Sequence, residues 1–178
     1  MNQAIQAHKN LLKKWRKAMD LIGPGSMEPH FEDANQAVKN LNAQGLWVDL
    51  GSGAGFPGIA LAAHHPQAHV LMVESRQKRV LFLKRVVQES QLSNIEIYHG
   101  RSENLIQTFD GVISRAYRKP LAYLEDARRL SKPHAQTVLL LGGDNPFVPP
   151  DHWMIKEDST YTISTGSRRR LILCAKMA

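Results

Sequence analysis

The sequence predicts an α/β protein with one doubly wound sheet that follows a short helical N-terminal segment. The length of 178 residues suits a single domain of ordinary size. From residue 45 onward, short apolar runs alternate with helical stretches, which is typical of successive βαβ units. Before residue 45, apolar residues recur with helical spacing. We therefore expect a helical cap over residues 1–44 and a sheet domain over residues 45–178, joined in one compact unit.

Two helices are expected in the cap. The apolar residues of the first segment recur every three or four positions with basic residues between them, as in an amphipathic helix. They are Ile5, Leu11, Leu12, Trp15, Met19 and Ile22. This helix should end at the Gly-Pro-Gly of residues 23–25, because glycine terminates helices and proline cannot continue one. A second, shorter helix is expected over residues 28–43.

The elements of the sheet domain follow in order along the chain. Residues 46–50 form a run too short and too uniformly apolar for an exposed strand, which indicates a buried parallel strand. Further strands are expected at 69–73, 95–98, 110–114 and 136–141, and helices from residue 57, over 77–91 and over 120–130. The tail has two more strand-like segments, 153–156 and 170–175, with no obvious helix between them. This predicts an antiparallel hairpin at one edge of the sheet.

Composition indicates which binding partners and which cellular compartment to expect. There are 23 lysines and arginines against 16 aspartates and glutamates, a net charge of +7 that favours association with polyanions such as nucleic acid. The single cysteine, Cys174, excludes an intrachain disulfide and favours a reducing compartment, so a cytoplasmic location is expected. No apolar stretch approaches the ~20 residues of a membrane span, and no secretory signal is recognisable, so no membrane partner is expected.

A glycine-rich loop carries the densest functional signal. Residues 49–58, Asp-Leu-Gly-Ser-Gly-Ala-Gly-Phe-Pro-Gly, lie between the first expected strand and the first helix of the sheet domain. Glycines there permit positive φ and close approach of a ligand, and the carboxyl end of the first strand borders the ligand crevice of a doubly wound sheet. We expect this loop to contact a cofactor through Asp49, Gly51, Gly53 and Gly55.

The acidic residues beside the loop favour S-adenosylmethionine as that cofactor. The loop also matches the dinucleotide pattern G-x-G-x-x-G, but Asp49 precedes the first glycine, and a carboxylate there suits a cationic ligand better than a pyrophosphate. Glu74 follows Asp49 by 25 residues, at the end of the second strand, where an acid can accept hydrogen bonds from ribose hydroxyls. The adjacent His64 and His65 face different sides of their helix, so no metal site is expected.

Several motifs taken together resemble a known family. They are residues 49–58, 74–80, 101–103 and 109–116, with 15–19 and 30–33 upstream and 170–173 downstream. Their order and spacing are similar, over most of the chain, to those of the bacterial small-subunit rRNA guanine-N7 methyltransferases, the glucose-inhibited division protein B family.

The resemblance implies a fold, an activity and a set of contacts. The fold would be a Rossmann-like, seven-stranded class I methyltransferase sheet, and the activity S-adenosylmethionine-dependent methylation of N7 of a guanine in 16S rRNA. The partner would be 16S rRNA or the small ribosomal subunit, and a monomer is expected. The cofactor would be held by Gly51 and Phe56 in the loop, Glu74 near the ribose, Ser102 and Glu103 around the adenine, and Arg115 beside the reactive end.

The chain departs from this family at two places. A Lys-Gly pair ends the fifth strand in the family, whereas this chain has Leu141-Gly142, and residues 142–151 contain three prolines with no room for the helix that follows there in the family. These departures keep two alternatives open. One is a methyltransferase of the same fold that acts on a small molecule or protein, and the other is a non-catalytic RNA-binding factor in ribosome assembly.

Methylation of guanine N7 requires no general base, because its lone pair is available without deprotonation. Rate enhancement must then come from proximity, alignment and electrostatics. Since an N7-methylated guanine is cationic, basic residues should hold phosphates rather than contact the ring. Arg115 is the expected positioning residue, and Arg118 is a second candidate for a phosphate contact.

Other residues are weaker candidates for RNA contacts. Phe56, Tyr117 and Phe147 lie in loops on the expected ligand side, where aromatic rings can stack on a splayed-out base. The three arginines at 168–170 either bind a phosphate or lie in solvent, and the salt dependence of RNA binding distinguishes these possibilities.

Overall fold

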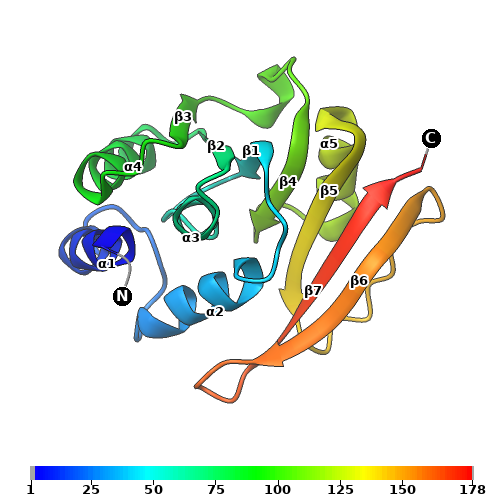
Figure 1. The fold of residues 1–178 in the computed structure, drawn as a ribbon. Helices are drawn as coiled ribbons and strands as arrows, with labels where there is room; N and C mark the ends of the chain where they lie inside the picture. Colours follow the sequence, from blue (N-terminus) through cyan, green and yellow to red (C-terminus); the bar gives the residue numbers. More distant parts are fainter. Residues whose placement is uncertain (1–2, 178) are drawn as a thin grey trace.

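The computed structural model describes residues 3–177, and within them a single sheet of seven strands forms the centre of the molecule (Figure 1). This confirms the predicted α/β class and the seven-stranded sheet. In spatial order the strands are β3 (Ile95–His99), β2 (Ala68–Glu74), β1 (Gly45–Leu50), β4 (Phe109–Arg115), β5 (Ser131–Gly142), β7 (Arg168–Lys176) and β6 (Trp153–Thr162).

Strand pairing makes the sheet doubly wound. β1 pairs in parallel with both β2 and β4, while β3 pairs with the outer side of β2 and β5 with the outer side of β4. The chain therefore builds outward from β1 in one direction and then returns to build in the other. The order reverses between β1 and β4, and the crevice at the carboxyl ends of these strands is the usual ligand site of such a sheet.

The tail forms the predicted antiparallel hairpin at one sheet edge. β7 pairs with β5, where Leu141 lies opposite Arg170 and Gly142 opposite Arg169, and β6 pairs with the outer side of β7. β6 and β7 are both longer than their apolar segments predicted, because polar residues continue the pairing beyond the apolar positions. β5 also begins earlier than expected, at Ser131, directly after the last helix.

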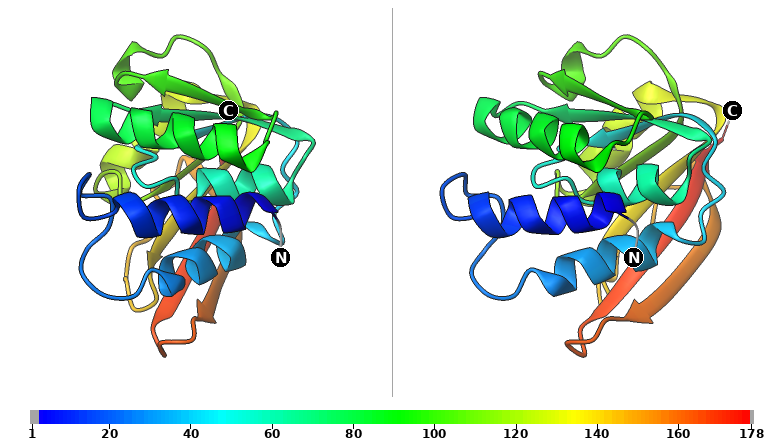
Figure 2. Two further views of the ribbon diagram at one scale, coloured as in Figure 1. Left: turned by 90° about the vertical axis from the view of Figure 1, so that its left-hand side faces the viewer. Right: turned by 60° about the vertical axis from the view of Figure 1, so that its left-hand side comes forward.

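Helices cover the two faces of the sheet unequally. On one face lie α1 (Gln3–Trp15), α2 (Glu28–Val38), α3 (Gly58–His64) and α4 (Gln77–Ser90), with α1 running beside α4 (Figure 2). The other face carries α5 (Pro120–Leu130) and a short 3₁₀ helix, η1 (Ser102–Asn104). None of the helices in residues 3–177 has the length and apolarity needed to span a membrane.

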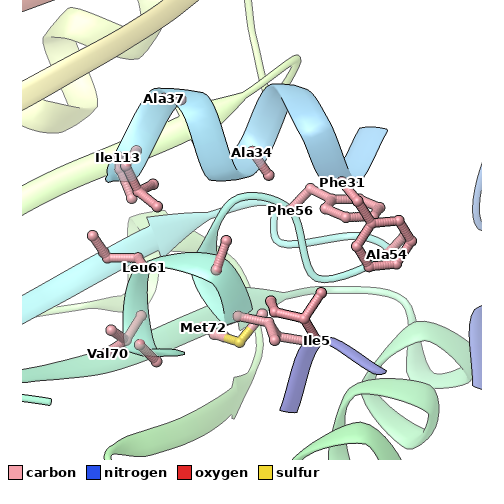
Figure 3. Close-up of a cluster of buried hydrophobic side chains, with 14 of the residues drawn as sticks. Ile5, Phe31, Ala34, Ala37, Ala54, Phe56, Leu61, Val70, Met72 and Ile113 are labelled. Atoms are coloured by element: carbon pink, nitrogen blue, oxygen red, sulfur yellow. The ribbon is translucent and has the colours of Figure 1, made fainter. Parts of the chain in front are cut away.

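Each face of the sheet has its own buried apolar cluster. The first joins α1 to α4 with the sheet and includes Phe31, Phe56 and Met72 (Figure 3). The second lies under α5 and includes Phe109 and Tyr123. Because α1 and α2 contribute to the first cluster, the cap shares its core with the sheet.

The ends of both cap helices were predicted wrongly. The first helix ends at Trp15 instead of continuing to Ile22, and the second ends at Val38 instead of residue 43. The apolar spacing persists beyond α1 because Leu21 is still buried and Ile22 still packs on the core, although the backbone there forms turns.

No helix follows β5 in the described chain, as the prolines predicted. Residues 143–152 cross to β6 as a turn and an extended loop. Arg170 holds this loop in place, since its guanidinium donates to the carbonyls of Asn145 at 2.6 Å and Phe147 at 2.9 Å. The Phe147 ring is partly buried and packs against the second apolar cluster.

Candidate active site

A cleft of about 350 Å³ opens at the point where the strand order reverses. Its walls come from the segments that follow β1, β2, β3 and β4, which parallel pairing brings to the same edge of the sheet. Four predicted site residues line it: Gly51, Glu74, Ser102 and Glu103. The sequence therefore placed these residues correctly at one edge, although they span more than 50 positions of the chain.

The glycine loop reaches this first cleft at Gly51 and has a conformation that suits glycine. Gly51, Gly53 and Gly55 have φ values of 69°, 55° and 91°, in the left-handed region. A Cβ atom on Gly51 would lie 2.6 Å from Cδ2 of Tyr117, so the ring of Tyr117 lies directly against the loop backbone. The missing side chain at Gly51 is therefore needed for the wall of the cleft to form.

Asp49 lies beneath the loop and is fully buried. Its Oδ2 accepts a hydrogen bond from the Gly58 N–H at 3.2 Å, which ties the end of β1 to the start of α3, whereas Oδ1 has no hydrogen-bond partner. Burial raises the pKa of Asp49 to about 7, against the lowering effect of its hydrogen bonds. Asp49 does not line the cleft, but it places an unpartnered carboxylate oxygen close under the loop.

Glu74 connects the loop to the start of α4. Its Oε2 accepts from the Gly53 N–H at 3.0 Å and its Oε1 from the Arg76 N–H at 2.8 Å. Each carboxylate oxygen has a further lone pair, so Glu74 can still accept hydrogen bonds from a ligand in the cleft. This is the arrangement needed to receive a pair of neighbouring hydroxyl groups.

The opposite wall is a network around Tyr117, which sequence reasoning considered only as a stacking residue. Ser102 Oγ and the Tyr117 hydroxyl oxygen lie 2.5 Å apart, and Tyr117 also donates to Asp126 Oδ2 at 3.2 Å. Burial raises the pKa of Tyr117. Arg118 forms ion pairs with Glu103 and Asp126, so this arginine is already occupied and is a poor candidate for a phosphate contact.

A second cleft, of about 530 Å³, lies on the other side of residues 116–118. Ala116 and Arg118 line both clefts, so the two meet at the segment that follows β4. The second cleft lies between α2 and the ends of β4, β5 and β7 and is lined by His30, Asp33, Arg115, Leu141, Asn145 and Arg169 among others. A ligand in one cleft can therefore lie close to a ligand in the other.

Arg115 faces the second cleft and does not line the first. Its Nη1 donates to Asp33 Oδ2 at 3.3 Å and to the His30 carbonyl at 3.4 Å, and its guanidinium carbon lies 4.7 Å from the centre of the Phe56 ring. Burial lowers the pKa of Arg115, and burial together with Arg115 lowers that of His30. The guanidinium is thus held by the cap at the second cleft.

Gly55 and Phe56 line neither of these clefts. Phe56 is buried against Phe31, with ring centres 4.8 Å apart (Figure 3). The imidazole of His8 lies 4.9 Å from the Phe56 ring, centre to centre. His8 Nε2 lies 2.6 Å from the Ala54 carbonyl oxygen and must donate to it. These contacts hold the loop from below, so the structure places Phe56 as a support of the loop.

His8 and Tyr161 were missed in the sequence, and Arg169 was named only as one of three arginines that could bind a phosphate. His8 looks like one more polar residue of an amphipathic helix, and nothing in its spacing marked it. Tyr161 donates to Asp33 Oδ1 at 2.7 Å from β6, and Arg169 Nε lies 3.5 Å from the same oxygen. Only the pairing of β6 and β7 with the rest of the sheet brings these two residues to the cap. Asp33 itself lay within the segment 30–33 that carries the family resemblance.

The second cleft has a cation although this chain has Leu141 where the resembled family has a lysine. Leu141 lines that cleft, and its neighbour Gly142 pairs with Arg169, whose side chain lines the same cleft from β7. The positive charge therefore comes from a different strand.

The first cleft fits S-adenosylmethionine by the chemistry of its groups. Glu74 lines the cleft with lone pairs that can accept from ribose hydroxyls, and Ser102 and Glu103 line it as well. Asp49 stays buried under the loop and does not reach the cleft. In the part of the chain that the structure describes, no group of three or more histidine, cysteine, aspartate or glutamate side chains could hold a metal ion.

Similar structures show the fold. The chain superposes on M. jannaschii TYW2 in complex with AdoMet with a TM-score of 0.67 and 13% identity, covering 86% of this chain and 79% of that chain. The O-methyltransferase from Bacillus cereus in complex with SAH gives a TM-score of 0.66 and 15% identity, covering 96% of this chain and 91% of that chain. The chain therefore has the Rossmann-like fold of class I methyltransferases.

Sequence comparison is more specific. A family model, GidB, described as rRNA small subunit methyltransferase G, matches residues 1–147. The chain is 32% identical over 176 residues to Ribosomal RNA small subunit methyltransferase G of Wolinella succinogenes, covering 97% of this chain and 88% of the relative. It is 32% identical over 187 residues to the protein of the same name from Pseudomonas putida, covering 98% and 87%. The chain belongs to the GidB family, the rRNA small subunit methyltransferase G proteins.

Proposed function

We propose that this protein is an S-adenosylmethionine-dependent methyltransferase that transfers a methyl group to N7 of a guanine in 16S rRNA. The observation that carries the proposal is that a member of this family has two clefts meeting at residues 116–118. The first offers the acceptors of Glu74, Ser102 and Glu103, and the second the guanidinium groups of Arg115 and Arg169. One cleft suits a cationic nucleoside and the other a nucleotide of an RNA strand. Substrate and cofactor then approach each other across a shared wall.

The cofactor would occupy the first cleft. Glu74 would accept hydrogen bonds from the ribose, and Ser102 and Glu103 would surround the adenine. Asp49, Gly53, Gly55 and Phe56 would act through the conformation of the loop, while Gly51 leaves room for the Tyr117 ring that walls the cleft. When bound, S-adenosylmethionine supplies an electrophilic methyl group on a sulfonium sulfur.

The protein's own contribution to the reaction is orientation. N7 needs no deprotonation, so the second cleft does not have to provide a base, and Asp33 there is engaged by Tyr161 and two arginines. Arg115 is the catalytic candidate because it lines the second cleft directly before Ala116, which both clefts share, and there it would position the incoming nucleotide. Its fixed contacts with Asp33 and His30 keep it from having to reorganise during the reaction.

The remaining properties of the molecule agree with an RNA substrate. The net charge of +7 favours approach to a polyanion. We further propose that the protein acts as a monomer in the cytoplasm, on 16S rRNA or on the small ribosomal subunit.

A transfer assay tests the function. Purified protein is incubated with donor labelled in the methyl group and with unmodified 16S rRNA or small subunits, and the RNA is digested to nucleosides. We expect label in 7-methylguanosine alone. Label in another nucleoside contradicts the N7 assignment. Label in a small molecule or protein but not in RNA favours the first alternative, and cofactor binding without any transfer favours a non-catalytic assembly factor.

A matched pair of variants tests the cofactor site. Glu74→Gln keeps the shape of the side chain but replaces one acceptor oxygen by a donor, so we expect cofactor affinity to fall roughly tenfold or more. Glu125→Gln makes the same change at an exposed position on α5 and should leave affinity unchanged. Isothermal titration calorimetry measures both. Equal affinities for the two variants would contradict the assignment of Glu74.

A further inference from the structure

The three consecutive arginines of β7 have different surroundings. Neighbouring residues of a strand point to opposite faces. Arg168 forms an exposed ion pair with Asp144 at 3.0 Å. Arg170 forms a double contact with Asp158, at 2.6 and 2.8 Å, and also holds the loop after β5. Both guanidinium groups are therefore used within the protein.

Arg169 differs because it lines the second cleft. Its Nε lies 3.5 Å from Asp33 Oδ1, and its Nη1 donates to the Arg168 carbonyl at 3.1 Å. Among the described residues its Nη2 has no hydrogen-bond partner. The guanidinium is thus anchored on one side and keeps N–H donors available.

Arg115 approaches the same carboxylate from the opposite side. Its three contacts with Asp33 and His30 are 3.3 to 3.5 Å long, at the weak end of the hydrogen-bond range. Two guanidinium groups thus share one carboxylate, which leaves a net positive charge in this part of the cleft. Tyr161 donates to Asp33 as well and so fixes the carboxylate between the two arginines.

We propose that Arg169, together with Arg115, binds a backbone phosphate of the RNA strand that carries the target guanine. This inference rests on the proposed function and adds the anchoring contact. Two converging guanidinium groups match the geometry of a phosphate. The base is a poor alternative partner, because a guanidinium donating to N7 would block the methylated atom and would repel the cationic product.

The salt dependence of RNA binding tests this contact. The probe is unmodified 16S rRNA made by transcription, and filter binding measures its affinity over a series of potassium chloride concentrations. Arg169→Gln should weaken binding roughly tenfold. It should also reduce the magnitude of the slope of log K against log salt concentration by about 0.7 to 0.9, the value for one released phosphate contact. Arg169→Lys keeps the charge, so it should preserve the slope and lower the affinity.

The matched control is Arg168→Gln, which removes the neighbouring arginine from the other face of the strand and should leave the slope unchanged. Calorimetric titration with S-adenosylmethionine should give the same affinity for all three variants, which shows that they are folded. The proposal is overturned if Arg169→Gln leaves the slope unchanged, if Arg168→Gln changes it equally, or if the wild-type protein does not bind the RNA.

The outcomes separate this proposal from the function on which it rests. If the wild-type protein transfers no methyl group to rRNA but Arg169→Gln reduces the salt dependence of RNA binding, the phosphate contact stands and the proposed activity is wrong. If the wild-type protein methylates N7 but Arg169→Gln leaves the slope unchanged, the proposed activity stands and the phosphate contact is wrong.

Discussion

Two buried titratable residues hold the glycine loop, and burial shifts the pKa of each in the direction that favours its neutral form. Asp49 lies beneath the loop at the end of β1, with its pKa raised to about 7 by burial. His8 approaches from α1, with its pKa lowered to about 4, again mainly by burial. Both shifts follow from the same cause, the cost of a charge in an apolar interior.

The raised pKa of Asp49 predicts a pH-dependent cost to folding. The folded state holds its proton up to about pH 7, whereas the unfolded chain releases it near 3.8, so this residue's contribution to stability is lost as the pH rises through that interval. Asp49→Asn keeps the shape without the charge. Between pH 4 and pH 8 the wild type should therefore lose on the order of 3 kcal/mol more unfolding free energy than this variant.

Urea denaturation of both proteins at several pH values measures this difference. Comparing variant with wild type cancels the contribution of His8, which titrates in an overlapping range with the opposite sign. Parallel curves for the two proteins would show that Asp49 is not the residue that titrates.

Gly51 is the glycine whose replacement should affect the cofactor cleft most. In Gly51→Ala the methyl group would meet Tyr117 at 2.6 Å as well as requiring a φ of 69°. In the control, Gly53→Ala, the φ of 55° imposes backbone strain, but no atom lies closer than 3.7 Å to the added Cβ. We expect cofactor affinity in calorimetry to fall roughly tenfold more in Gly51→Ala than in Gly53→Ala. Equal losses would mean that backbone strain alone matters.

At the scale of elements, α1 acts as a support for the loop between β1 and α3. The hydrogen bond from His8 Nε2 to the Ala54 carbonyl, at 2.6 Å, joins them, and the rings of Phe31 and Phe56 enclose it. The cap helix thus helps to set the loop conformation that the cleft requires.

The hydrogen bond of His8 should matter more to the loop than the packing of its imidazole ring. His8→Leu leaves the carbonyl of Ala54 without its donor and should cost about 1 to 3 kcal/mol of unfolding free energy. His8→Gln can still donate and should recover part of that loss and of the cofactor affinity. Denaturation and calorimetry check both variants. Equal behaviour of the two would show that packing, and not the hydrogen bond, is what His8 provides.

His8 also predicts the response to acid. Its folded pKa of about 4 lies below the ordinary value of 6.5, so its contribution to stability is complete above pH 6.5 and is lost as the pH falls toward 4. His8→Gln removes this contribution, and its unfolding free energy should therefore fall less than that of the wild type on acidification from pH 7 to pH 4. An equal fall in both proteins would contradict the buried, neutral state of His8.

The elements that the sequence predicted best were those whose apolar pattern and backbone conformation agree. The buried strands β1, β2 and β4 and the loop after β1 are of this kind. The end of α1 was misjudged because Leu21 and Ile22 are apolar for tertiary packing and not for helix formation. The lengths of β6 and β7 were underestimated because Glu157 and Asp158 extend the hairpin through backbone pairing, which polarity does not reveal.

For the whole molecule, we propose that the cap of residues 1–44 and the sheet domain of residues 45–178 unfold as one unit. The cap helices share the first apolar cluster with α3, α4 and the sheet. Asp33 of α2 is also bonded to Arg115, Tyr161 and Arg169 from three different strands. Separation of the cap would expose that cluster and leave buried charges unpaired.

Single-tryptophan variants test this cooperativity. The three tryptophans, Trp15, Trp47 and Trp153, lie in α1, β1 and β6, so each variant that keeps one of them and replaces the others by phenylalanine reports on one part of the fold. In each variant the fluorescence midpoint in urea should coincide with the far-ultraviolet circular dichroism midpoint. An earlier midpoint for Trp15 fluorescence alone would show that the cap unfolds independently.

The candidate site was only partly accessible from the sequence. Gly51, Glu74, Ser102 and Glu103 could be placed because each follows a predicted parallel strand, and parallel strands end at one edge. The second cleft could not be placed, because it depends on how α2 and the β6–β7 hairpin dock against β4. Arg169 and Tyr161 reach Asp33 only after that docking.

The central claim is that the cleft lined by Gly51 and Glu74 holds the methyl donor next to the cleft lined by Arg115 and Arg169. A crystal structure of the protein with S-adenosylhomocysteine tests it most directly. We predict that the ribose lies beside Glu74, the adenine beside Ser102 and Glu103, and the sulfur toward residues 116–118. A ligand bound elsewhere, or none bound at saturating concentration, would contradict the account.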